Sequence, residues 1–170
     1  MANTYTLIAS STVSSANNSI TFSSIPSTYT DLVVKFSGRS STSLDIIGIN
    51  FNASTSGYTF KVLRGSGSAA ASFDQTSFAP IGQFGLSGYI SSDTSTFCNH
   101  EIYIPNYAGS TNKSFSVDAV QEANATTAYS TLVANLWSNT AAITSVKIYC
   151  TLGANIEVNS TAYLYGVKNA

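Results

Sequence analysis

Apolar and polar residues alternate with a period of two along most of this chain. Tyr58, Phe60 and Val62 share one side of an extended segment, with polar residues between them. Phe115 and Val117 repeat the arrangement later in the chain. Successive side chains of a β-strand point to opposite faces, so this pattern is typical of strands with one face in a core and the other outside. The chain is therefore predicted to be all-β.

About ten segments carry this strand pattern, and turns rich in Ser, Gly and Asn separate them. They are Tyr5–Ala9, Ser19–Ser23, Asp31–Ser37, Ile46–Phe51, Tyr58–Arg64, Phe97–Ile104, Ser114–Val120, Tyr129–Trp137, Val146–Cys150 and Tyr163–Val167. Short strands at regular spacing favour an antiparallel β-sandwich, with a jelly roll as the leading topology. No convincing helix is predicted, although Ala119–Ala128 contains enough helix-forming residues for one turn.

The length and the apolar content fit a single domain over residues 1–170. A chain of 170 residues with 44% apolar residues can bury a sizeable core, and this composition excludes general disorder. Only 9% of the residues are charged, compared with about 25% in an average soluble domain. The seven cations are scattered, so no basic stripe for nucleic acid is predicted, and no segment has the apolar length of a membrane span or the pattern of a secretory signal.

Two segments are predicted as long loops, Gly65–Ser72 and Phe78–Ser95. Loops of this length in a compact sandwich usually bind a ligand or pack against a neighbour. The aromatic residues Phe78, Phe84 and Tyr89 are therefore candidate interface residues. The alternative, that they cover one open end of the sandwich, fits the sequence equally well.

Residues that could carry chemistry are few. His100 is the only histidine, and Cys98 falls on the same face of the same predicted strand. We expect a histidine in the core or at an interface rather than a catalytic one, because no nucleophile motif accompanies it. Cys98 and Cys150 are expected to be buried free thiols, with a disulfide as the alternative.

The acidic residues are spread singly along the chain. Asp31, Asp45, Asp74 and Asp93 fall at strand ends or in turns, where an aspartate usually caps backbone amides. No pair of carboxylates suits a glycosidase and no cluster suits calcium, so neither an enzyme nor a cofactor is predicted. A shallow sugar site built from Tyr and Asn stays open, but Trp137, the only indole, is expected to pack in the core.

Segments in a fixed order span nearly the whole chain and form a recognisable set. They are Thr6–Ser11, Ile20–Pro26, Thr28–Val34, Ser37–Arg39, Ile49–Asn52, Ile104–Tyr107, Trp137, Ala142–Val146 and Ala162–Val167. The chain thereby resembles small virion structural proteins of tailed bacteriophages, notably those that infect marine and freshwater bacteria. Pro26–Val34 and Leu164–Val167 are the most specific parts of the resemblance.

The resemblance implies a β-sandwich that occurs alone or attached to tail fibres and head appendages, with no catalytic residues to carry over. It ranks a capsid decoration protein first, because no long helical or repetitive shaft of a tail fibre is present. The expected location is then the virion, and the expected partners are the major capsid protein and further copies of this chain, as a trimer. The alternative is a short tail-fibre or head-appendage component that binds a host receptor or surface glycan.

Two candidate surfaces for capsid contact follow, the N-terminal segment Met1–Ser11, with Tyr5 and Leu7, and the loop Phe78–Ser95. An N-terminal arm can add as a strand to the sheet of a neighbour, and main-chain hydrogen bonds then supply the affinity. The alternative is that Tyr5–Ala9 forms the first strand of its own sheet.

Overall fold

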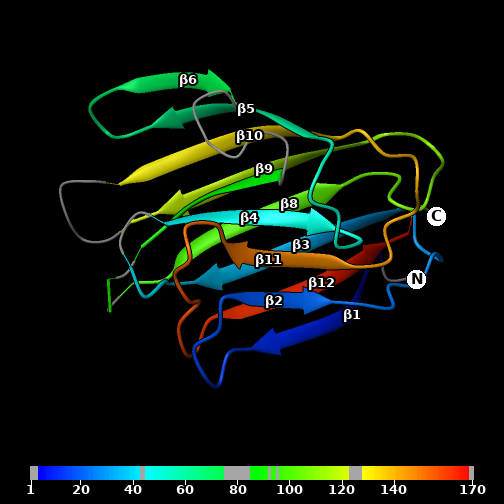
Figure 1. Ribbon diagram of the computed structural model, residues 1–170, viewed down its shortest axis with the longest axis horizontal. Helices are drawn as coiled ribbons and strands as arrows, with labels where there is room; N and C mark the ends of the chain where they lie inside the picture. Colours follow the sequence, from blue (N-terminus) through cyan, green and yellow to red (C-terminus); the bar gives the residue numbers. More distant parts are fainter. Residues whose placement is uncertain are drawn as a thin grey trace.

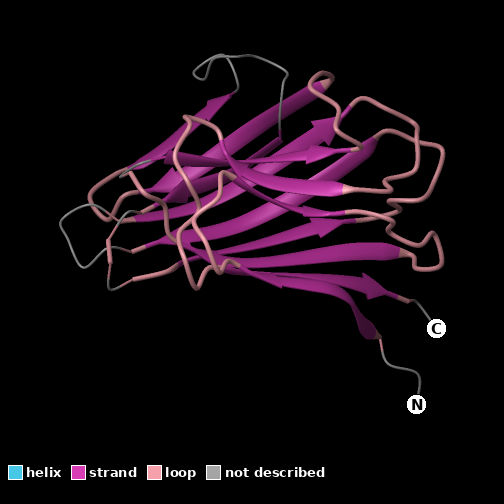
Figure 2. Ribbon diagram, turned by 60° about the horizontal axis from the view of Figure 1, so that its bottom comes forward, coloured by secondary structure: helices cyan, strands magenta, loops and turns pink. Residues whose placement is uncertain are grey.

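Two antiparallel β-sheets pack face to face (Figure 2). The computed structural model describes residues 4–42, 45–74, 85–91, 93–94, 96–122 and 128–168. Within these ranges the strands are β1 (Tyr5–Thr12), β2 (Ser19–Phe22), β3 (Asp31–Gly38), β4 (Asp45–Phe51), β5 (Tyr58–Gly65), β6 (Ala70–Asp74), β7 (Gly85–Ile90), β8 (Cys98–Ile104), β9 (Lys113–Gln121), β10 (Tyr129–Trp137), β11 (Val146–Cys150) and β12 (Thr161–Val167). The large sheet has the order β1-β12-β3-β8-β9-β10-β5-β6, and the small sheet has the order β2-β11-β4-β7. The predicted all-β sandwich is confirmed.

Eight of these strands form a jelly roll. β1 pairs with β12, β2 with β11, β3 with β8 and β4 with β7. Among these eight strands, the first four therefore pair with the last four in reverse order. This nesting places β1, β12, β3 and β8 in one sheet and β2, β11, β4 and β7 in the other. Such a double sheet is the jelly-roll arrangement that the spacing of the strands favoured.

Two insertions widen one sheet of the jelly roll. β5 and β6 follow β4 in the chain, β9 and β10 follow β8, and all four join the large sheet beyond β8. In Figure 1 β3 and β12 lie behind the strands of the small sheet, whereas β5 and β6 extend past that sheet. The large sheet therefore has a jelly-roll half, β1-β12-β3-β8, and an inserted half, β9-β10-β5-β6.

The alternating pattern places the core between the two sheets. In β8 the even-numbered residues from Cys98 to Ile104 are buried and the residues between them are exposed, and β9 shows the same alternation. Aromatic rings attach the inserted half to the small sheet. The Trp137 ring stacks on Tyr58 with centroids 6.0 Å apart, and it meets Phe51 edge-on at 5.6 Å. Trp137 is therefore a core residue, as predicted.

Both segments predicted as loops contain a strand that the sequence pattern did not indicate. β6 lies within and just after Gly65–Ser72, where Ala70–Asp74 pairs with β5. β7 lies within Phe78–Ser95 and pairs with β4 at the edge of the small sheet. No helix occurs in the part of the chain that the structure describes, and none there is long and apolar enough to cross a membrane.

The N-terminal segment belongs to its own sheet. β1 pairs with β12 from Tyr5↔Val167 to Thr12↔Thr161, with a bulge between Leu7 and Ala9. Of the two alternatives for Met1–Ser11, the first strand of its own sheet is the one that the structure shows for residues 5–11; Met1–Asn3 lie outside the described residues.

Candidate interaction surface

His100 and Cys98, the residues of β8 considered for catalysis, face the core. His100 is fully buried, and its ring centroid lies 5.5 Å from that of Phe36. Cys98 shares this face, and its Sγ accepts a hydrogen bond from the Ser91 amide at 3.2 Å. Cys98 and Cys150 are buried free thiols, as predicted. Burial raises the pKa of both thiols, that of Cys150 to about 12 with a smaller contribution from Asp45, so neither is a ready nucleophile at neutral pH.

Two aspartates hold backbone amides, as their positions at strand starts predicted. Asp45 is 1% exposed and accepts hydrogen bonds from the amides of Ile46, Leu152 and Ala154 at 2.6–3.1 Å. Asp31 accepts bonds from the Asn106 amide at 2.8 Å and from the Tyr103 hydroxyl at 2.7 Å. No group of three or more His, Cys, Asp or Glu side chains suited to a metal ion occurs among the residues with a described placement.

The outer face of the large sheet is broad and carries many exposed apolar side chains. Eight strands at a spacing of about 4.8 Å make it roughly 38 Å wide, and strands of about seven residues make it roughly 23 Å long. Its plan area of roughly 900 Å² is comparable to the ~800 Å² that one partner contributes to a standard protein interface. Most of the exposed large apolar side chains of the described chain lie on this face, from Tyr5 and Leu7 to Leu63, Tyr103, Leu132 and Tyr163.

Four tyrosines gather on the jelly-roll half. In one row across the sheet, Leu7 lies opposite Tyr165, Tyr165 opposite Val33, and Val33 opposite Tyr103. Tyr5 lies edge-on to Tyr165 at 6.4 Å, and Tyr163 stacks on Tyr165 at the same centroid distance. We call the set Tyr5, Leu7, Val33, Tyr103, Tyr163 and Tyr165 the tyrosine patch.

Val33 shows how closely the tyrosine patch is packed. Its parity with Lys35 directs it outward, yet it is only 1% exposed, because it lies between Tyr165 and Tyr103 in register. Tyr5, Tyr103 and Tyr163 keep 53%, 39% and 38% exposure. The patch is therefore an ordered layer that still presents aromatic surface.

One pair of opposite charges beside the tyrosine patch is matched within the chain. Lys35 and Glu101 lie opposite each other in register and form an ion pair at 2.7 Å. The hydrogen bond from Glu101 raises the pKa of Lys35. The bond to Asp31, with burial, raises the pKa of Tyr103 to about 12, so its hydroxyl stays protonated as a donor.

Leucines and shallow grooves occupy the inserted half. Leu63 lies directly opposite Leu132, and both are more than half exposed. With Ala134 and Leu136 they form what we call the leucine patch. Because Ala134 is small, grooves of about 540 Å³ and 440 Å³ open on its two sides.

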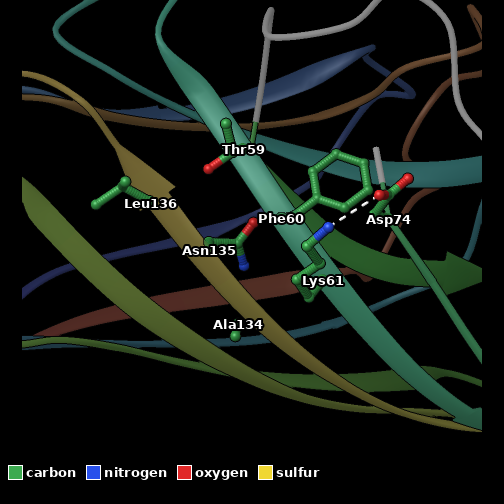
Figure 3. A pocket seen from close by; sticks show the side chains of 7 residues that line it. All are labelled: Thr59, Phe60, Lys61, Asp74, Ala134, Asn135 and Leu136. Atoms are coloured by element: carbon green, nitrogen blue, oxygen red, sulfur yellow. Dashed lines mark hydrogen bonds and ion pairs between the residues drawn. The ribbon is translucent and has the colours of Figure 1, made fainter. Parts of the chain in front are cut away.

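Figure 3 shows the larger of these two grooves. Thr59, Lys61 and Leu136 border it, and Lys61 forms an ion pair with Asp74 at 2.8 Å. The groove thus has apolar side chains beside a hydroxyl and an ion pair. The hydroxyl and the ion pair can orient a polar group that enters the groove, and Leu136 offers it apolar contact.

The structure brings two of the five predicted interface residues together. Tyr5 and Leu7 are neighbours in the tyrosine patch, whereas Phe78 and Phe84 lie outside the described residues. Tyr89 belongs to β7 of the small sheet, where its backbone lies opposite that of Ile46 in β4, away from the tyrosine patch of the large sheet. Sequence reasoning missed Tyr103, Tyr163 and Tyr165, although the alternation of β8 and β12 already set these side chains apart from the core.

Comparison of the chain with protein-family models, curated proteins and solved structures finds no match.

Proposed function

We propose that this protein is a structural component of a bacteriophage particle, a capsid decoration protein that binds the outside of the head and stabilises it. The observation that carries the proposal is the outer face of the large sheet, which is the size of a protein interface and presents apolar side chains over both halves. The resemblance of the sequence to small phage virion proteins supports the same conclusion.

The scarcity of charge suits a protein whose role is packing. Bringing a charged side chain into an interface removes its water, and this costs free energy unless a partner charge is well placed. On the outer face Lys35 and Lys61 already have partner carboxylates within their own chain. A lattice of capsid subunits can therefore cover this face without leaving these ammonium groups unmatched.

The inserted half is the better candidate for the capsid contact. Leu63 and Leu132 project from neighbouring strands, and the grooves beside Ala134 can receive side chains from a partner. Apolar anchors in pockets, with polar groups around them, are the usual centre of a protein interface.

A second candidate function, binding of a host glycan by a short tail fibre or head appendage, is favoured by the polar border of the same groove. Thr59, Lys61 and Asp74 could bond to sugar hydroxyls beside the apolar side chain of Leu136. This candidate would be supported if the protein bound host cells saturably and free glycan competed with that binding.

Localisation of the protein in a cryo-EM map of the intact particle, with its copy number, tests both candidates. Hundreds of copies in an icosahedral lattice on the head are the expected result. A handful of copies on the tail or at one vertex would overturn the decoration role and favour the glycan-binding one. A protein that is absent from the particle would overturn both.

A further inference from the structure

We propose that the tyrosine patch lies at the symmetry axis of a homo-oligomer, where each copy of this chain covers the patch of its neighbours. The inference does not depend on the proposed function, because it concerns the contact of the chain with itself.

The tyrosine patch presents a contiguous aromatic surface. Tyr5, Tyr103 and Tyr163 are each more than a third exposed, and they lie on neighbouring strands around the buried Val33. Tyrosine is enriched in protein interfaces and among the residues that carry their binding energy. Contiguous exposed apolar surface on a folded domain marks a contact site more often than chance.

The absence of charge from the patch points to a second copy of this chain as its partner. Residues near a symmetry axis meet their own copies, so a patch with an unmatched charge would repel itself. The tyrosine patch contains no charged residue, and Lys35 and Glu101 beside it neutralise each other at 2.7 Å. Asp118 lies opposite Glu101 but on β9, in the inserted half and outside the patch. Asp31 is 7% exposed and is held by Tyr103 and Asn106. This surface is therefore compatible with a second copy of itself.

The edge strand beside the patch also needs cover. β1 forms the edge of the large sheet with the sequence Tyr-Thr-Leu-Ile-Ala-Ser-Ser-Thr, which contains neither a charge nor a proline. Proteins usually protect such edges with Lys, Pro, bulges or a covering element. β1 has only the bulge near Ile8, and β6 at the opposite edge is shorter and ends in Asp74. A second copy that covers the tyrosine patch also shields this edge.

The size of the patch is sufficient for such a contact. Four strands of about seven residues cover roughly 440 Å² in plan, so two copies would together bury roughly 900 Å², close to the ~1,000 Å² expected of a specific interface.

The test is the mass of the full-length protein in solution, measured by light scattering coupled to size exclusion. We expect a mass of at least two chains of 17.8 kDa each. Leu7→Lys places like charges around the axis, and it should lower the mass to that of one chain at the same concentration. Leu132→Lys is the matched control, because Leu132 is 52% exposed and Leu7 is 51% exposed. It should leave the oligomer intact.

Circular dichroism and thermal unfolding show whether each variant is folded. If Leu7→Lys does not fold, Leu7→Thr keeps a side chain suited to a strand while removing apolar area, and it should weaken the association at least tenfold. A monomeric wild-type protein at 100 µM would overturn the inference. Dissociation by Leu132→Lys but by neither Leu7 variant would also overturn it. Both outcomes are independent of where the protein lies on a phage particle.

Discussion

The two halves of the large sheet present different surfaces on one continuous framework. The jelly-roll half has packed tyrosines over a buried Val33, whereas the inserted half has separated leucines with grooves between them. A packed aromatic layer suits one repeated contact, and grooves suit side chains supplied by a different partner. Two insertions can thus add a second, chemically different surface to a jelly roll by lengthening one sheet, with no new layer.

The halves also differ in what lies on their inner side. β5, β9 and β10 of the inserted half contact β7, and Trp137 and Tyr58 pack on Phe51 of β4. In the jelly-roll half the Phe36 ring instead packs on His100 of the neighbouring strand. The halves can therefore differ in local stability, and this difference can be tested directly.

The largest effect is expected for Trp137→Ala. Removing a fully buried indole should lower the free energy of unfolding by about 3–5 kcal/mol, because it deletes the ring that joins β10 to Tyr58 and Phe51. Amide hydrogen exchange should then increase mainly in β5, β9 and β10.

Phe36→Ala is the matched variant in the jelly-roll half, where Phe36 is 1% exposed and contacts His100. It should cost a similar free energy, with increased exchange in β3, β8 and β12. If both variants raised exchange equally in all strands, the two halves would be one cooperative unit and the comparison would fail.

The next effect concerns partner choice. Leu132→Asp adds a charge to the leucine patch, and it should weaken binding to phage heads that lack the protein by ten- to a hundredfold, or about 1.4–2.7 kcal/mol. The mass of the oligomer in solution should not change. Sedimentation of the protein with purified heads measures the binding. Unchanged binding would mean that the inserted half does not face the capsid.

A smaller effect is expected for Tyr103→Phe. The native pKa of Tyr103 is about 12, above its ordinary value of 10, so the folded state holds this proton more tightly. Its contribution is complete below pH 10 and is lost as the pH rises from 10 to 12. The variant should lose about 1 kcal/mol of unfolding free energy at pH 8, because the bond to Asp31 is partly exposed to solvent.

Urea unfolding at several pH values measures this difference, which should shrink as the pH approaches 12. Tyr163→Phe is the control, because Tyr163 belongs to the same patch and its hydroxyl is not the one bound to Asp31. A difference for Tyr103→Phe that stayed constant to pH 12 would contradict the assigned hydrogen bond.

The smallest effect is expected for the two surface ion pairs. Lys61→Ala should change the free energy of unfolding by less than about 0.5 kcal/mol, because exposed pairs contribute little. Lys35→Ala should behave alike in a monomeric variant such as Leu7→Lys. In the wild-type oligomer it should cost more, since a neighbouring copy would cover the pair. Thermal unfolding of the wild type, Lys35→Ala, Leu7→Lys and the double variant checks this second expectation. If Lys35→Ala caused equally small shifts with and without Leu7→Lys, a neighbouring copy would not cover the patch.

The sequence predicted the strands with regular alternation and the side to which their residues point. It did so because a half-buried strand must separate apolar from polar side chains. β6 escaped prediction because Ala70–Asp74 has no such alternation, and it is a strand through its backbone pairing with β5. β7 escaped because glycines at 85 and 88 interrupt the pattern.

The candidate surface was only partly predictable. Tyr5, Tyr103 and Tyr163 each lie in a recognisable strand, but the order of strands in the sheet brings them together, and no local pattern encodes that order. Val33 illustrates the same limit, because its burial depends on rings from Tyr103 and Tyr165. The positions of Asp31 and Asp45 predicted that each carboxylate would accept hydrogen bonds from backbone amides. Their distant partners, such as Asn106 and Leu152, could not be predicted.

The nested strand pairing also determines when the fold can close. Within the described chain β1 pairs only with β12, and β2 pairs along its length only with β11. Contacts so distant in sequence form slowly, and during synthesis the early strands would wait with open edges. The first two strands can join their sheets only after the last two are in place, so completion of the C-terminal strands is the event that commits this chain to its native structure.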